Sequence, residues 1–293
     1  MIMKRLFSLF AAVLLLLSLA GCAYSQNSAQ IAATTLPVYE FTSRLCDGTG
    51  LSVTRLVTEN VSCLHDYSLS VRQVKAVESA QVVILSGGGL EDFMKDMLSN
   101  AGCVIESAEG IPFLECPENH DHSHDHVHGQ DPHFWLSPVH AKQMAQNICA
   151  GLKKQYPQFT SVFDTNLARL LSDLDALMLY GQQQLQLLSC RELITFHDGF
   201  SYFAEAFGLK ILEAVEEESG SEASAAELKH LITLVNVHNL PAIFTERSGS
   251  ISAAGIIAQE TGVNTFCLDM AMSGDSYFEA MVHNIDTVKE ALG

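Results

Sequence analysis

Apolar residues follow two different spacings along the chain, and each spacing predicts a different element. Short unbroken apolar runs, of which "AQVVILSGGG" at 80–89 is the clearest, stop at glycines or polar residues. Such runs are typical of strands buried on both faces. Between them, apolar residues recur every three or four positions, which is the spacing of a helix with one buried face. This alternation predicts βαβ units, and therefore parallel sheets with helical crossovers.

The predicted elements form two groups along the chain. The first group has strands at 30–36, 52–57, 80–89 and 102–107, with helices at 37–46 and 90–101. The second group has strands at 192–197, 209–215, 242–246 and 264–269, with helices at 199–208, 224–239, 250–262 and 276–292.

A single long helix is predicted between the two groups. Residues 159–188 contain no proline, and their apolar positions keep the helical spacing. A helix of about 30 residues would be about 45 Å long, enough to span a two-domain body. We therefore expect an α/β fold with an N-terminal lobe at 31–158 and a C-terminal lobe at 189–293. Each lobe should hold a mostly parallel sheet flanked by helices, and the long helix should join them.

The N-terminus has the arrangement of a secretory signal. Two basic residues precede an apolar run from Leu6 to Ala20, and this run is shorter than the roughly 20 residues that span a membrane. The following "LAGC" resembles the lipobox of bacterial lipoproteins. We expect 1–21 to be removed as signal peptide, Cys22 to be lipidated and 22–30 to be a flexible tether. The alternatives are an uncleaved anchor, or an ordinary signal with an incidental cysteine. The expected location is extracytoplasmic, lipid-anchored to the bacterial cell membrane.

Charge and cysteine content narrow the class of protein further. Acidic residues outnumber basic ones by 34 to 16, which disfavours nucleic acid and anionic membrane surfaces as partners and favours cations. Apart from Cys22, seven of the eight cysteines remain. An odd number cannot all pair internally, so one or two disulfides and buried thiols both stay open.

The histidines are distributed in two ways. Six of the twelve lie between 120 and 133, and five of these alternate with acidic and small residues in a predicted loop at 119–129. The loop is either a solvated polar segment or a low-affinity metal collector. Its five residues are His120, His122, His124, His126 and His128.

Three other histidines occupy the places where ligands bind in α/β proteins. His65 and His197 each follow a predicted strand, one in each half of the chain, and His133 lies in the proline-flanked loop "DPHFWLSP". Ligands bind beyond the carboxyl ends of parallel strands, and imidazole with carboxylate is a good zinc site. The residues alone leave the carboxylate open among Asp66, Asp131, Asp198, Glu216, Glu217, Glu218, Glu222, Asp269 and Asp275. We expect His140, His230, His238 and His283 to be surface or capping residues.

Four segments in order resemble one family, the solute-binding lipoproteins of zinc and manganese ABC importers (cluster A-I, ZnuA/TroA-like receptors). The resemblance covers nearly the whole chain after the signal. One departure is "LHDYSLS", which keeps only His65 and Tyr67 of the family's Pro-His-x-Tyr-Glu-Pro. The matching segments are "AQVVILSGGGLEDFM", "DPHFWLSP", "FHDGFSYFAEAFGL" and "GDSYFEAMVHNID".

The resemblance implies a metal site in the cleft between the lobes, made by His65, His133, His197 and Asp275, with a rigid linking helix. Histidine at 197 favours Zn²⁺ over Mn²⁺, and four ligands without an open position indicate binding and not catalysis. The implied protein is a monomeric, non-enzymatic zinc receptor that delivers Zn²⁺ to an ABC permease and its ATPase. The alternatives are a manganese or broad-specificity receptor, or a metal-dependent adhesin of the same fold. A zinc hydrolase is disfavoured because the chain lacks HExxH.

Overall fold

The computed structural model describes residues 30–59, 61, 64, 67–99, 101–115, 130–215, 223–247 and 252–293. The expected signal peptide, Cys22, His65, the five histidines of the loop at 119–129 and Glu222 lie outside the described residues. Within the described part, no helix combines the length and apolar character needed to cross a membrane.

The N-terminal lobe is built on a parallel four-stranded sheet. Its strands are β1 (Ile31–Ala33), β2 (Val53–Arg55), β3 (Val82–Leu85) and β4 (Val104–Glu106), in the order β2-β1-β3-β4. The sheet is covered on both faces, as the unbroken apolar run of β3 predicts. Val82 and Ile84 join the larger core, whereas Val83 and Leu85 join a separate cluster on the opposite face.

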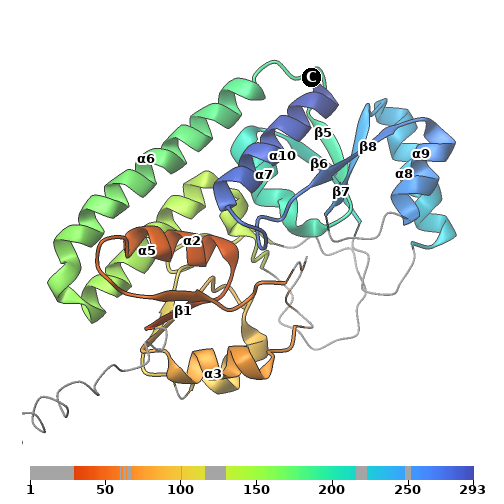
Figure 1. Cartoon of the computed structure of the whole chain (residues 1–293). Helices are drawn as coiled ribbons and strands as arrows, with labels where there is room; N and C mark the ends of the chain where they lie inside the picture. Colours follow the sequence, from red (N-terminus) through yellow and green to blue (C-terminus); the bar gives the residue numbers. More distant parts are fainter. Residues whose placement is uncertain are drawn as a thin grey trace, which may run out of the picture.

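The C-terminal lobe repeats this topology. Its strands are β5 (Glu192–Thr195), β6 (Lys210–Ala214), β7 (Ala242–Glu246) and β8 (Asn264–Leu268), all parallel, in the order β6-β5-β7-β8. In both sheets the first strand of the lobe lies between the second and the third. Figure 1 shows the two sheets in separate lobes, with helices packed around each.

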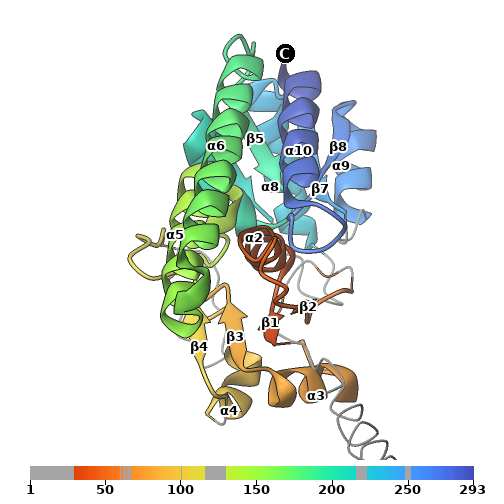
Figure 2. The same cartoon turned by 60° about the vertical axis from the view of Figure 1, so that its left-hand side comes forward.

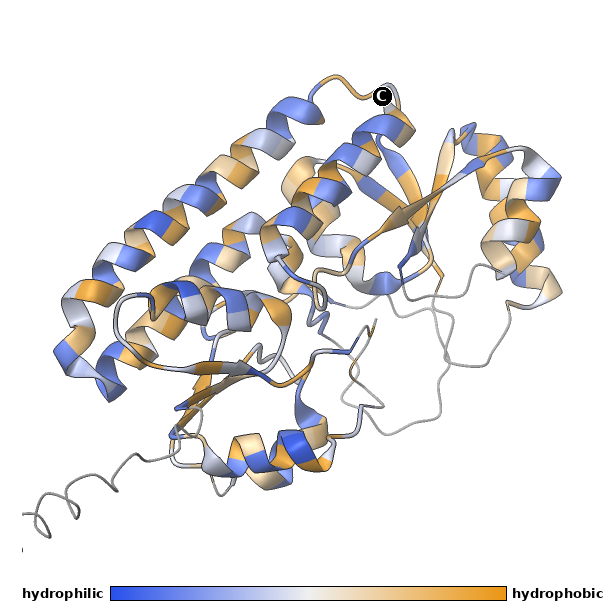
Figure 3. Ribbon diagram, in the orientation of Figure 1, coloured by the Kyte–Doolittle hydropathy of each residue, from blue (hydrophilic) through white to orange (hydrophobic). Residues whose placement is uncertain are grey.

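The longer helices bury apolar residues, and polar and apolar residues alternate along them (Figure 3). In the N-terminal lobe they are α2 (Leu36–Leu45), α3 (Val71–Ser79), α4 (Lys95–Leu98) and α5 (Pro138–Gln155). In the C-terminal lobe they are α7 (Ser201–Phe207), α8 (Ala225–His238), α9 (Ser252–Thr261) and α10 (Tyr277–Leu292).

The long helix α6 (Thr160–Gln184, 25 residues) joins the lobes. It runs beside α5 at one end and α10 at the other (Figure 2). The predicted helix at 159–188 was too long, because Pro157–Phe159 forms a 3-10 turn and the helix ends before Leu185. At that end the Arg191 guanidinium donates to the Leu185 carbonyl at 2.7 Å, so a side chain replaces the next helical turn.

Two helical segments of the N-terminal lobe differ from expectation. The helix predicted at 90–101 is a 3-10 turn (Asp92–Met94) followed by the single turn α4. In addition, α3 was not predicted. It begins with a capping box, in which the Ser70 hydroxyl accepts from the Gln73 N–H and the Gln73 side chain accepts from the Ser70 N–H, a sequence signal also present as Ser-x-x-Gln.

Candidate metal site

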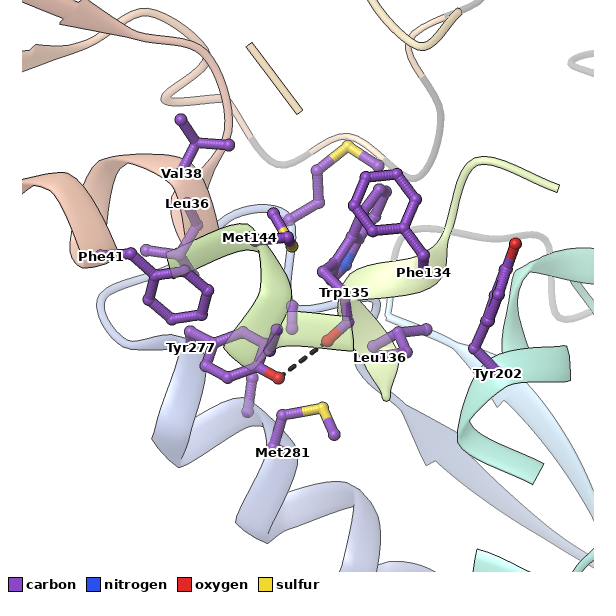
Figure 4. Packing of buried hydrophobic residues seen from close by; sticks show 14 of the residues in the cluster. Leu36, Val38, Phe41, Phe134, Trp135, Leu136, Met144, Tyr202, Tyr277 and Met281 are labelled. Carbon is purple, nitrogen blue, oxygen red and sulfur yellow. Dashed lines mark hydrogen bonds between the residues drawn. The ribbon is translucent and has the colours of Figure 1, made fainter. Parts of the chain in front are cut away.

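His133 is presented by a rigid turn between the lobes. It directly precedes the 3-10 turn Phe134–Leu136, all three of whose residues are fully buried. Trp135 Nε1 donates to the Met270 carbonyl at 2.8 Å, and the Tyr277 hydroxyl donates to the Trp135 carbonyl at 2.7 Å. Figure 4 shows this second bond, with Trp135 packed among core residues. Because Met270 and Tyr277 belong to the C-terminal half, the turn is held from both lobes.

Asp131 orients the His133 ring. Its Oδ1 accepts from the His133 backbone N–H at 2.9 Å and lies 2.8 Å from His133 Nδ1. A carboxylate acceptor places the proton on Nδ1 and leaves Nε2 free to bind a metal. The backbone of Asp131 is fixed in turn, since the Tyr202 hydroxyl donates to its carbonyl at 2.9 Å.

His197 meets His133 from the other lobe. It lies two residues beyond the end of β5, and its Nε2 is 3.5 Å from His133 Nε2. The rings stand nearly perpendicular, with centroids 5.2 Å apart. His133 is 3% exposed and His197 is 9% exposed. Gly199 allows this approach, because a Cβ there would lie 2.9 Å from an atom of each imidazole.

Carboxylates surround the histidine pair. Asp198 Oδ1 is 3.7 Å from His197 Nε2, and Glu246 Oε2 is 3.7 Å from His197 Nδ1. Burial acts to lower the pKa of His133, but the Asp131 hydrogen bond and the charges of Asp131, Asp198 and Glu246 together raise that pKa. The surroundings therefore favour positive charge, which a bound divalent cation would supply.

One group of potential ligands stands out among the described residues. His133, His197 and Asp198 offer ligand atoms that all lie within 4.8 Å of one another. Neutral imidazole nitrogens with a carboxylate oxygen form a donor set suited to zinc.

The remaining predicted ligands are placed differently. Asp275 is exposed and is not part of the group, so its role as ligand stays a prediction. Asp269 is buried, but its Oδ2 is 3.0 Å from Arg247 Nη1 and its Oδ1 accepts from the Ala271 N–H. His65 stays a predicted ligand outside the described residues.

Glu246 was not predicted as a site residue, and Asp198 was one of several carboxylates that the sequence left open. Glu246 is the last residue of β7 and is 5% exposed. The rule that selected His197, a polar residue at the carboxyl end of a parallel strand, applies equally to Glu246. The four other histidines among the described residues each have a separate contact: His140 with the Tyr202 ring, His230 with Glu213, His238 with Glu192, and His283 with the Cys267 carbonyl.

A two-lobe α/β body with a buried histidine pair contributed by both halves is the architecture of a metal-binding solute receptor. The family described as ZnuA, zinc-uptake complex component A, periplasmic, matches residues 31–291. Since this match spans most of the chain, the protein belongs to that family.

Individual relatives agree with this assignment. The chain is 28% identical to the high-affinity zinc uptake system protein ZnuA of Bacillus subtilis (strain 168), over 96% of this chain and 95% of the relative. A crystal structure of ZnuA superposes with a TM-score of 0.79 at 29% identity, covering 90% of this chain and all of that one. Zn(II)-bound AdcA from Streptococcus pneumoniae superposes at 0.74 and 26% identity, over 89% of this chain and 57% of that one.

Proposed function

We propose that this protein is the extracytoplasmic zinc receptor of an ABC importer. The observation that carries the proposal is the pair of buried imidazoles from different lobes, with Nε2 atoms 3.5 Å apart. Two imidazole nitrogens this close, with a carboxylate oxygen in the same ligand group, form a site that a metal ion would bridge. Capture of the ion would bind the two lobes to each other.

Zinc is the proposed cargo because His133 and His197, the ligands contributed by the two lobes, are both nitrogen donors. Nitrogen suits zinc, whereas a site for manganese would favour more oxygen ligands. The names of the relatives, zinc uptake protein and zinc-bound AdcA, point the same way. Manganese or broad-specificity binding is the alternative that a competition experiment separates from this proposal.

The proposed ligand set is His133, His197, His65 and one carboxylate. Asp198 is the carboxylate that the described geometry favours, since it is in the ligand group, and Asp275 is the one that the family resemblance implies. A set of four protein ligands leaves no position for a reacting water, so the proposed role is binding without catalysis.

The cellular setting completes the proposal. A lipid at Cys22 would hold the monomeric receptor at the outer face of the cell membrane, next to the permease and ATPase to which it delivers zinc. A strongly acidic chain, with a net charge of −18, suits a protein that collects cations and has no affinity for nucleic acid.

Calorimetric titration of the metal-free protein with Zn²⁺ tests the proposal, with Mn²⁺ in competition. We expect one tight zinc site that is lost in His133→Ala and in His197→Ala. His230→Ala is the matched control, because His230 is exposed on α8, contacts Glu213 and is not in the ligand group. Unchanged zinc affinity in the first two variants would overturn the site, and a clear preference for Mn²⁺ would overturn the choice of cargo.

A further inference from the structure

The N-terminus of α10, in the C-terminal lobe, is capped by a side chain from the other lobe. Glu40 Oε2 of α2 accepts from the backbone N–H of Tyr277 at 2.6 Å, and the Ser276 hydroxyl donates to Glu40 Oε1 at 3.4 Å. The first N–H groups of a helix have no partner within the helix, and the helix dipole favours a negative charge there. Glu40 thus joins the two lobes at a point where a carboxylate binds well.

Arg44 and Phe41 extend this contact on the same face of α2. The Arg44 guanidinium lies 4.7 Å from the centre of the Phe278 ring and pairs with Asp173 of α6. The rings of Phe41 and Tyr277 meet edge to face, with centroids 5.0 Å apart. We call the residues Glu40, Phe41 and Arg44 together with Ser276, Tyr277 and Phe278 the α2–α10 joint.

The α2–α10 joint is connected directly to the histidine pair. The Tyr277 hydroxyl donates to the Trp135 carbonyl (Figure 4). Trp135 is two residues from His133 in the sequence. On the same C-terminal segment, the Met272 carbonyl accepts from the Leu36 N–H at 3.1 Å and the Met270 carbonyl accepts from Trp135 Nε1. The chain from Met270 to Tyr277 is therefore bound to the N-terminal lobe at its start, its middle and its end.

Met270 brings this segment to the imidazoles themselves. A Cβ added at Gly199 would meet the Met270 methyl carbon as well as the rings of His133 and His197. These groups share one small space, so a displacement of the segment would alter the separation of the two rings.

The burial of Glu40 opposes the ionisation of its side chain. Burial raises the pKa of Glu40, even though the Tyr277 N–H, the Arg44 charge and the Ser276 hydroxyl all act to lower that pKa. A carboxyl group whose pKa is higher in the folded than in the unfolded chain makes the folded state less stable once it is ionised. Ionisation of Glu40 therefore does not itself stabilise the folded chain, and the structural contribution of this side chain lies in its contacts with α10.

We propose that Glu40 is a positioning residue for metal retention, which holds the start of α10 against α2 so that the metal-free protein already presents His133 and His197 as a pair. This inference rests on the proposed zinc-receptor function. A preformed site binds more tightly because no free energy is spent on ordering the lobes when the ion arrives.

The test compares Glu40→Gln with wild type in two measurements. The first is the rate of zinc loss to an excess of chelator, and the second is the thermal midpoint of the metal-free protein. Glutamine keeps the size and one acceptor but makes a hydrogen bond about half as strong as the charged one. We expect zinc loss about fivefold faster and a thermal midpoint that is unchanged or higher.

Glu78→Gln serves as the matched control, since Glu78 is an exposed glutamate on a helix of the same lobe. It should leave both quantities unchanged. Zinc loss at the wild-type rate in Glu40→Gln would overturn the inference, and so would faster loss accompanied by a lower midpoint, which indicates general destabilisation. If the wild-type protein bound neither zinc nor manganese, the proposed function would fail first, and the two failures are thus distinguished.

Discussion

Asp131 and His133 are bound to each other twice through a single oxygen. Asp131 Oδ1 accepts from the backbone N–H of His133 at 2.9 Å and contacts Nδ1 of its ring at 2.8 Å. The first bond fixes the backbone of the turn and the second fixes the ring and its tautomer. As a result, Nε2 is the nitrogen directed at His197.

Asp131→Asn should weaken zinc binding without removing it. The amide retains an acceptor oxygen but loses the charge that holds the proton on Nδ1, and loss of such a partner costs about 10- to 100-fold in metal affinity. Calorimetric titration measures the change. Asp96→Asn is the control, since Asp96 is exposed on α4. Equal affinities of wild type and Asp131→Asn would show that the ring needs no such support.

Gly199→Ala should damage the site by steric contact alone. The new Cβ would lie 2.4 Å from the Met270 methyl carbon and 2.9 Å from atoms of both His133 and His197. Methionine can move, but the rings can yield only by changing their separation, and a binding site tolerates shifts of only about 0.5 Å. We expect zinc affinity to fall about tenfold or more, with about 1–3 kcal/mol of lost stability from overpacking.

Gly255→Ala provides the comparison for that variant. Gly255 lies in α9, and an added Cβ would meet nothing within 4 Å. Alanine there should stabilise the protein by about 0.5–1 kcal/mol, because it favours helix, and should leave zinc affinity unchanged. Wild-type affinity in Gly199→Ala would mean that the imidazoles are not confined as the structure has them.

The local sequence pattern was sufficient to predict the strands that are buried on both faces. The apolar runs at 80–89 and 242–246 predicted β3 and β7, because strands buried on both faces have an unambiguous composition. The run at 90–101 was misread as one helix, since its apolar positions serve a 3-10 turn and a short α4. Periodicity reports which residues are buried and does not report where a helix breaks.

The histidines of the site could be predicted from the sequence, but the carboxylates could not. His133 and His197 could be selected from loop and strand-end positions, and the structure places their Nε2 atoms 3.5 Å apart. The nearness of Glu246 to His197 could not be predicted, because it depends on how β5 and β7 pair. Asp198 directly follows His197 in the sequence, but sequence alone does not show that its oxygen turns toward the imidazoles, and the family resemblance implied the exposed Asp275 instead.

Zinc affinity should fall as the pH is lowered, beginning above the ordinary titration range of histidine. The carboxylates around His133 raise its pKa above the usual value of 6.5, and zinc must displace the proton to bind. The folding stability of the metal-free protein depends on pH in the opposite direction. The stabilisation from protonated His133 is present below about pH 6.5 and is lost as the pH rises through the raised pKa.

Titrations at several pH values between about 8 and about 5.5 measure this dependence. In Asp131→Asn the fall in affinity should begin at a lower pH, because the largest favourable partner of the charged ring has been neutralised. A constant affinity over the whole range would contradict the assignment of His133 as a ligand.

Deletion of residues 119–129 should leave one tight zinc site. The five histidines removed do not include His133, whose turn is anchored through Trp135 and Asp131. Weak additional zinc binding should disappear, and the stoichiometry at high zinc should drop toward one. Loss of nearly all binding would instead favour a storage or adhesin role for the loop.

The structure and the family resemblance predict different carboxylate ligands. The structure favours Asp198, and the resemblance implies Asp275. Asp198→Asn replaces an oxygen in the same ligand group as both histidines. Asp275→Asn changes an exposed residue outside that group. Both substitutions remove one negative charge while keeping size, so they are matched to each other.

If Asp198 is the ligand, its variant should lose about tenfold or more in zinc affinity, as expected for removal of a charged donor, and Asp275→Asn should bind as wild type does. The reverse result would assign the site to Asp275 and would require the segment 273–276 to move toward the histidines on binding. Glu246→Gln adds a third arm. Because Glu246 lies beside Nδ1 of His197, its loss should reduce affinity less than loss of a direct ligand, and a zinc-bound crystal structure would show which oxygen reaches the metal.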